Sequence, residues 1–171
     1  MLRGVLHFSF TVSSIESCIH WYTDVLGLEL VHRQRQDNSY TRALVGVPDA
    51  ILEVAQFKIP GVSPGISTHM LELVEYVSPV GEQPPLRTND VGCAHLALLV
   101  TDIQKEYERL RVHGVQFRNP PVEITAGANQ GGYACYFRDP DGITLELLQP
   151  SPARLEALGV AGSTAAARRP V

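Results

Sequence analysis

Leu71-Glu72-Leu73-Val74 recurs later in the chain as Leu145-Glu146-Leu147-Leu148, with a single glutamate between leucines in both copies. The likeness extends toward the N-terminal end of each half, because aligning His7 with His95 keeps the matched positions in order as far as these stretches. Each half therefore begins with a stretch that contains a histidine and ends with Leu-Glu-Leu. Self-similarity of this kind predicts a duplicated structural module.

Local signals give both halves the same order of elements. Short apolar runs at 6–12 and 94–100 predict strands. Ser13-x-x-Glu16 and Thr101-x-x-Gln104 fit the capping box that begins a helix, and Gly27 and Gly114 stand where a left-handed cap would end it. Further strands are expected at 29–34, 51–59 and 68–76 in the first half, and at 116–118, 133–137 and 144–148 in the second.

The expected fold class is α+β. Two tandem βαβββ modules would form a curved, mostly antiparallel sheet around a cavity. We expect the first module at 4–76, a breaker-rich linker at 77–91, the second module at 92–150 and a C-terminal tail at 151–171.

Composition limits the functions that fit this chain. Its 171 residues are 44% apolar and 19% charged, and the net charge of −4 argues against a partner nucleic acid. No apolar run approaches the roughly 20 residues that would cross a membrane, and the first residues match no signal peptide. The three cysteines form no C-x-x-C pair and suit a reducing compartment. We expect a cytoplasmic protein.

Four side chains stand out as candidate metal ligands. Side chains alternate along a strand, so Glu72 and Glu146 point away from the leucine faces that flank them. If the two modules pack with pseudo-twofold symmetry, these glutamates and His7 and His95 could converge on one point. Two imidazoles and two carboxylates suit a six-coordinate divalent metal ion. The order of metal affinities alone would not tell whether this ion is Mn, Fe, Co, Ni or Zn. A single strand histidine is more often structural, but its recurrence with a glutamate in both halves favours the metal site.

These residues resemble those of a known family, the vicinal oxygen chelate superfamily, which includes glyoxalase I, methylmalonyl-CoA epimerase and extradiol dioxygenases. The resemblance covers about residues 4 to 150. It is carried by three motifs: His7-Phe8-Ser9-Phe10-Thr11-Val12, Trp21-Tyr22-x-x-Val25-Leu26-Gly27-Leu28 and Asp139-Pro140-Asp141-Gly142-x-x-Leu145-Glu146-Leu147.

The resemblance implies a function. The family's metal ligands fall on His7, Glu72, His95 and Glu146, a set similar to that of bacterial glyoxalase I. It implies an isomerase or lyase, of lactoylglutathione lyase or epimerase type, that acts by α-proton transfer through a metal-stabilised enediolate on a small carbonyl compound or thioester. Glu146 or Glu72 would serve as the base, and a homodimer is expected.

Two alternatives stay open. One is an Fe(II) extradiol-type dioxygenase, which would need only three of the ligands. The other is a binding protein of the same fold that performs no chemistry.

Four further residues are weaker candidates for a role in the site. Glu53 is a second possible base, although an exposed strand residue explains it better. His69 is three positions from Glu72 and is therefore expected on the opposite strand face. Tyr133 and Tyr136 would line a pocket or pack in the core.

Overall fold

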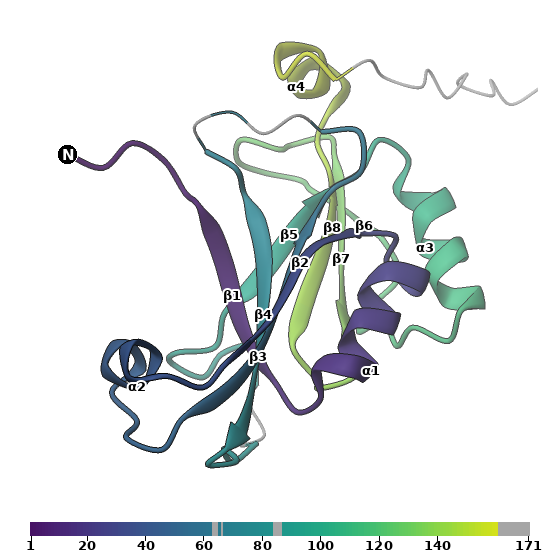
Figure 1. Cartoon of the computed structure of the whole chain (residues 1–171). Coiled ribbons are helices and arrows are strands. Elements are labelled where there is room, and N and C mark those ends of the chain that lie inside the picture. The colour runs from purple at the N-terminus through teal and green to yellow at the C-terminus, as the bar shows by residue number, and fades with distance from the viewer. Residues whose placement is uncertain (63–64, 66, 84–86, 161–171) are drawn as a thin grey trace, which may run out of the picture. The chain divides into compact units, whose positions relative to one another are not determined.

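The computed structural model describes residues 1–62, 65, 67–83 and 87–160, and it divides the chain into two compact units, Met1–Pro85 and Leu86–Val171. Each unit contains one four-stranded sheet (Figure 1). The tail was expected at 151–171, and its residues 161–171 lie outside the described residues.

The first unit is built on the sheet order β1-β4-β3-β2. Strands β1 and β4 pair in parallel, whereas β4 with β3 and β3 with β2 pair antiparallel. The elements along the chain are β1 (His7–Val12), α1 (Ile15–His20), a π-helical segment (Trp21–Val25), β2 (Glu29–Gln36), α2 (Ser39–Val45), β3 (Ile51–Lys58) and β4 (Met70–Ser78).

The second unit repeats this topology with the order β5-β8-β7-β6. Again the first and last strands pair in parallel, and the other two pairs are antiparallel. Its elements are β5 (His95–Leu99), α3 (Ile103–Val112), β6 (Val122–Glu123), β7 (Tyr133–Arg138) and β8 (Thr144–Gln149), followed by α4 (Pro152–Ala157). The predicted α+β class is confirmed, with each sheet mixed and mainly antiparallel.

The two leucine faces form the cores. In the first unit, Leu71 and Leu73 are 4% and 0% exposed, and the ring of Phe57 on β3 lies 5.8 Å from that of Tyr22 in the π-helical segment. In the second unit, Leu145 and Leu147 are 0% and 1% exposed. Burial of these leucines leaves the glutamate between each pair on the opposite face of its sheet.

The structure corrects the predicted helix starts by one residue each. Ser14 caps α1, its hydroxyl accepting from the Ser17 amide, and Asp102 caps α3, its carboxylate accepting from the Lys105 amide. Ser13 and Thr101 were therefore the wrong caps. Gly27 and Gly114 do take left-handed conformations, with φ of 84° and 81°, just after the helical segments.

Two further predictions were wrong in detail. The first unit contains an additional helix, α2, that was not predicted, although Asn38 caps its start and the left-handed Gly46 ends it. Val45 and Val47 at its end pack on Leu52 and Val54 of β3. In the second unit, the strand expected at 116–118 is reduced to an isolated bridge between Phe117 and Phe137, and β6 forms later in the chain. No helix in the described part of the chain has the length and apolar character needed to span a membrane.

Candidate metal centre

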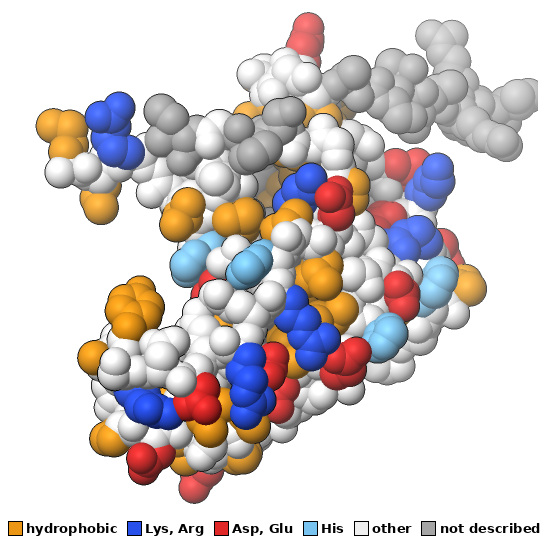
Figure 2. Space-filling view, in the orientation of Figure 1, with side chains coloured by type: hydrophobic (Ala, Val, Ile, Leu, Met, Phe, Trp, Pro, Cys, Tyr) orange, Lys and Arg blue, Asp and Glu red, His pale blue; other side chains and the backbone are white. Residues whose placement is uncertain are grey.

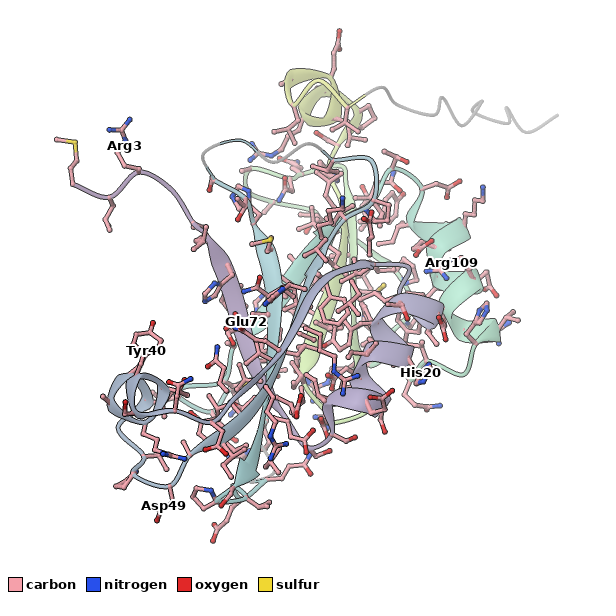
Figure 3. All side chains as sticks on the ribbon, in the orientation of Figure 1. Arg3, His20, Tyr40, Asp49, Glu72 and Arg109 are labelled. Atoms are coloured by element: carbon pink, nitrogen blue, oxygen red, sulfur yellow. The ribbon has the colours of Figure 1, made fainter. Side chains whose placement is uncertain are left out.

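The parallel pairing of β1 with β4 brings His7 and Glu72 together. His7 lies opposite Met70 and Ser9 opposite Glu72, so the glutamate is two residues beyond the histidine's partner and on the same sheet face. His7 Nε2 is 3.6 Å from Glu72 Oε1. Figure 3 labels Glu72 about midway along the ribbons of this sheet.

The second unit places His95 and Glu146 in the same way. His95 lies opposite Thr144 and Ala97 opposite Glu146, which reproduces the offset of two residues. His95 Nε2 is 3.2 Å from Glu146 Oε2. The repeat is therefore preserved in strand register as well as in sequence.

The distances within each pair are compatible with binding a metal. A nitrogen and an oxygen that both ligate one ion at about 2.1 Å are about 3.0 Å apart at a right angle and about 3.4 Å apart at the tetrahedral angle. The 3.2 Å between His95 and Glu146 falls in this range, and the 3.6 Å between His7 and Glu72 is just beyond it. Imidazole nitrogen with carboxylate oxygen is also a donor set that divalent transition metals accept.

Each unit brings together two of the four predicted ligands. Among the described residues of either unit, no group of three or more His, Cys, Asp or Glu side chains could hold a metal ion. The four-ligand set made from both modules therefore remains a prediction.

The two glutamates differ in their cross-strand neighbours. Gln56 on β3 lies directly opposite Glu72, and its Nε2 donates a hydrogen bond of 2.7 Å to Glu72 Oε2. The neighbour of Glu146 on β7 is Tyr136, whose ring centroid is 5.3 Å from that of His95. The sequence had indicated Tyr136 as a possible lining residue, but it had not indicated Gln56.

Burial changes the acidity of Glu146. Glu146 is 9% exposed, and its desolvation raises its pKa, while the charge of His95 and the hydrogen bond with it lower it by less. Desolvation and, secondarily, the charge of Glu146 raise the pKa of Tyr136. The carboxyl of Glu146 thus favours its protonated form more than a solvent-exposed glutamate would.

Glu53 and His69 lie apart from these pairs. Glu53 is paired with Glu75 in the ladder, on the sheet face opposite Glu72, and it makes ion pairs with Arg35 at 3.0 Å and Arg33 at 4.0 Å. His69 precedes β4 with φ of 49°, and its Nε2 is 3.2 Å from Ser67 Oγ. Strand alternation, on which its expected orientation was based, does not extend to His69.

The charged surface near β2 has mixed sign. Arg33 pairs with Glu16 of α1 at 2.8 Å in addition to its longer contact with Glu53. Figure 2 shows Lys and Arg next to Asp and Glu side chains on this surface, without a large patch of one sign. Such a surface gives no support to nucleic-acid binding.

Both units have the βαβββ topology and the same His–Glu register. Comparison with known sequences identifies the class of protein that has this arrangement. The sequence profile of the Glyoxalase/Bleomycin resistance protein/Dioxygenase superfamily matches residues 4–147. The chain belongs to this superfamily.

Similar proteins include two named enzymes. A 2-epi-5-epi-valiolone epimerase from Actinomyces sp is 32% identical over 158 residues, which cover 90% of this chain and 83% of that protein. A lactoylglutathione lyase from Arabidopsis thaliana is 26% identical over 153 residues, which cover 88% of this chain but 45% of that protein.

A solved structure confirms the fold. A glyoxalase family protein from Bacillus cereus matches with a TM-score of 0.72 at 20% identity, covering 88% of this chain and 96% of the other. The fold that the repeat predicted is therefore the glyoxalase fold.

Proposed function

We propose that this protein is a divalent-metal-dependent isomerase or lyase that moves a proton on the carbon next to a carbonyl group. The observation that carries the proposal is the His–Glu pair at the same strand register in both modules. Neither pair takes part in the leucine cores, so structural packing does not account for the repetition.

His7, Glu72, His95 and Glu146 are the residues proposed to hold the ion. When bound, a divalent ion would supply Lewis-acid stabilisation of negative charge on the substrate's carbonyl oxygen. The metal could be Ni, Co, Zn, Mn or Fe, since the donor set does not select among them.

Glu146 is the proposed base, with Glu72 as the second candidate. The Glu146 carboxylate lies beside His95 on a strand whose other face is fully packed, and from there it can accept a proton. Return of a proton to the opposite face of the same carbon gives an epimerase, and this step requires a proton donor on that second face. Return to the adjacent carbon gives an isomerase of the lactoylglutathione lyase type.

The relatives suggest which substrates to test. Because the 32% identical relative is named for 2-epi-5-epi-valiolone, we propose this compound as the first substrate. The hemithioacetal of methylglyoxal and glutathione is the second, as the lactoylglutathione lyase relatives suggest. A panel of acyl-CoA thioesters completes the set.

Exchange of the substrate's α-proton with deuterated solvent, followed by NMR, tests the proposal. We expect exchange by the metal-loaded protein, and a decrease of at least about 10² to 10⁴ in Glu146→Gln because both the base and a metal ligand are lost. Glu123→Gln, which alters an exposed glutamate on β6 of the same unit, should exchange like the unaltered protein.

Three results would contradict the proposal. The first is no exchange with any of these substrates. Oxygen uptake with a catechol, retained in Glu72→Gln and lost in His7→Ala, would show the dioxygenase instead. Metal-free protein that binds its ligand without turnover would show a binding protein.

A further inference from the structure

We propose that Gln56 is a positioning residue for the metal centre: its amide fixes one oxygen of Glu72 so that the other remains directed at the metal position beside His7. The inference rests on the proposed function in one respect, namely that Glu72 is a metal ligand. The inference assigns a role to a residue outside the four-ligand set, and it gives the two glutamates different roles.

The two oxygens of Glu72 have different partners. Oε2 accepts the 2.7 Å hydrogen bond from Gln56 Nε2, whereas Oε1 is the atom 3.6 Å from His7 Nε2. A hydrogen bond from an amide to a carboxylate is charge-assisted and stronger than one between neutral groups. Gln56 thus binds one carboxylate oxygen of Glu72, and the other oxygen is left to bind an ion.

Gln56 is itself held in place by its strand. Strand β3 lies between β2 and β4, so its backbone is hydrogen-bonded on both sides. The residues on either side of Gln56, Ala55 and Phe57, are both 0% exposed and lie in the core. The amide therefore projects from a backbone that packing and ladder hydrogen bonds fix, as a residue that orients a ligand requires.

The second module has no equivalent amide at this position. Tyr136 occupies the cross-strand position next to Glu146, and the described contact of the Glu146 carboxylate is with His95. Since the strand registers of the two modules are the same, the difference lies in the side chains alone. It makes Glu72 the stationary ligand and leaves Glu146 as the glutamate that can move to exchange a proton.

Binding of Co²⁺ to Gln56→Met tests this role without using activity. Methionine has a similar length and no donor, so the variant removes the hydrogen bond and retains the bulk. Titration calorimetry should show Co²⁺ affinity about 10 to 100 times weaker than that of the unaltered protein, the usual effect of losing a group that orients a ligand. The visible absorption of bound Co²⁺ should also change, because one carboxylate oxygen is no longer constrained.

Gln34→Met is the matched control. Gln34 is on the neighbouring strand β2, opposite Val54 and not opposite a glutamate. Its replacement should leave both the Co²⁺ affinity and the spectrum unchanged. Equal affinity in Gln56→Met and Gln34→Met would overturn the inference.

Glu72→Gln separates failure of this inference from failure of the proposed function. If Glu72→Gln weakens Co²⁺ binding and Gln56→Met does not, Gln56 has no positioning role but the metal site stands. If Glu72→Gln has no effect, or the unaltered protein binds no Co²⁺, both proposals are wrong.

A second measurement applies if Gln56→Met does not fold. In the unaltered protein, the side-chain amide protons of Gln56 should exchange with solvent more slowly than those of Gln34, because one of them is hydrogen-bonded to Glu72. Equal exchange rates would overturn the inference.

Discussion

At the scale of single residues, the three cysteines differ in accessibility and acidity. Cys135 is 2% exposed, and burial, with a smaller contribution from the charge of Glu146, raises the pKa of its thiol to about 11. Cys18 is 1% exposed, whereas Cys93 is partly exposed. Since the thiolate is the reactive form, these environments predict unequal reactivity.

We expect alkylation of the native protein at pH 8 to modify Cys93 first. At this pH roughly one Cys135 thiol in a thousand is ionised, and its rate of modification should rise about tenfold per pH unit up to its pKa. Peptide mapping after iodoacetamide treatment measures this, with urea-unfolded protein, in which all three react, as the control. Modification of Cys135 as fast as Cys93 would contradict the assigned burial.

Sequence alone could indicate the four candidate ligands and Tyr136, the neighbour of Glu146, but not Gln56, the neighbour of Glu72. The alternation of Leu71, Glu72 and Leu73 shows which way the glutamate points, because the period of a strand is two. Gln56 lies an even number of positions from Leu52 and Val54 and is therefore on the same face of β3. The sign of its role in the sequence was a polar residue on an apolar strand face. The hydrogen bond to Glu72 depends on strand register, which is set by contacts across the sheet.

At the scale of elements, the first amides of α1 and α3 each donate a hydrogen bond to a side chain on the last strand of their module. The Ile15 amide at the start of α1 donates to Glu75 Oε2, and the Ile103 amide at the start of α3 donates to Gln149 Oε1, both at 2.7 Å. Amides at a helix start have no partner within the helix, so these side chains satisfy them.

Gln149→Leu should therefore destabilise the protein. Loss of the acceptor leaves the amide of the buried Ile103 unpaired, which should lower the free energy of unfolding by about 1 to 2 kcal/mol in urea titrations. Gln104→Leu, at an exposed position of α3, should change it by less than about 0.5 kcal/mol. Equal effects in the two variants would show that the hydrogen bond contributes nothing.

The starts of α1 and α3 were easier to predict than the existence of α2 or the pairing of the strands. The capping signals were correct to within one residue, because Ser13 and Ser14, like Thr101 and Asp102, are adjacent residues that can both cap. Helix α2 was missed because its seven residues are too few to show a helical repeat. The parallel pairs β1–β4 and β5–β8 join distant segments, which no local pattern reveals.

At the scale of the whole molecule, the proposed function predicts one metal ion per chain. A site made from both modules should bind one Co²⁺ and lose it in either Glu72→Gln or Glu146→Gln, because each variant removes one of four ligands. Calorimetry gives the stoichiometry. The formal charge of −4 should become about −2 on binding, which native isoelectric focusing detects.

Separate sites in the two modules would give a different result. Each chain would then bind two ions, and each variant would lose only one of them. That stoichiometry would contradict a shared four-ligand centre.

The position of β1 at the edge of its sheet links ligand binding to folding. Contacts at its N-terminal end, such as that of Val5 with Ser67, join residues 62 positions apart, so His7 docks only after a long loop has closed. Strands of this kind form late and open first, because they are held on one side only within their sheet. An ion bound by both His7 and Glu72 would hold together the two strands at the ends of that loop. Loss of the ion would then weaken the attachment of the N-terminal strand to β4.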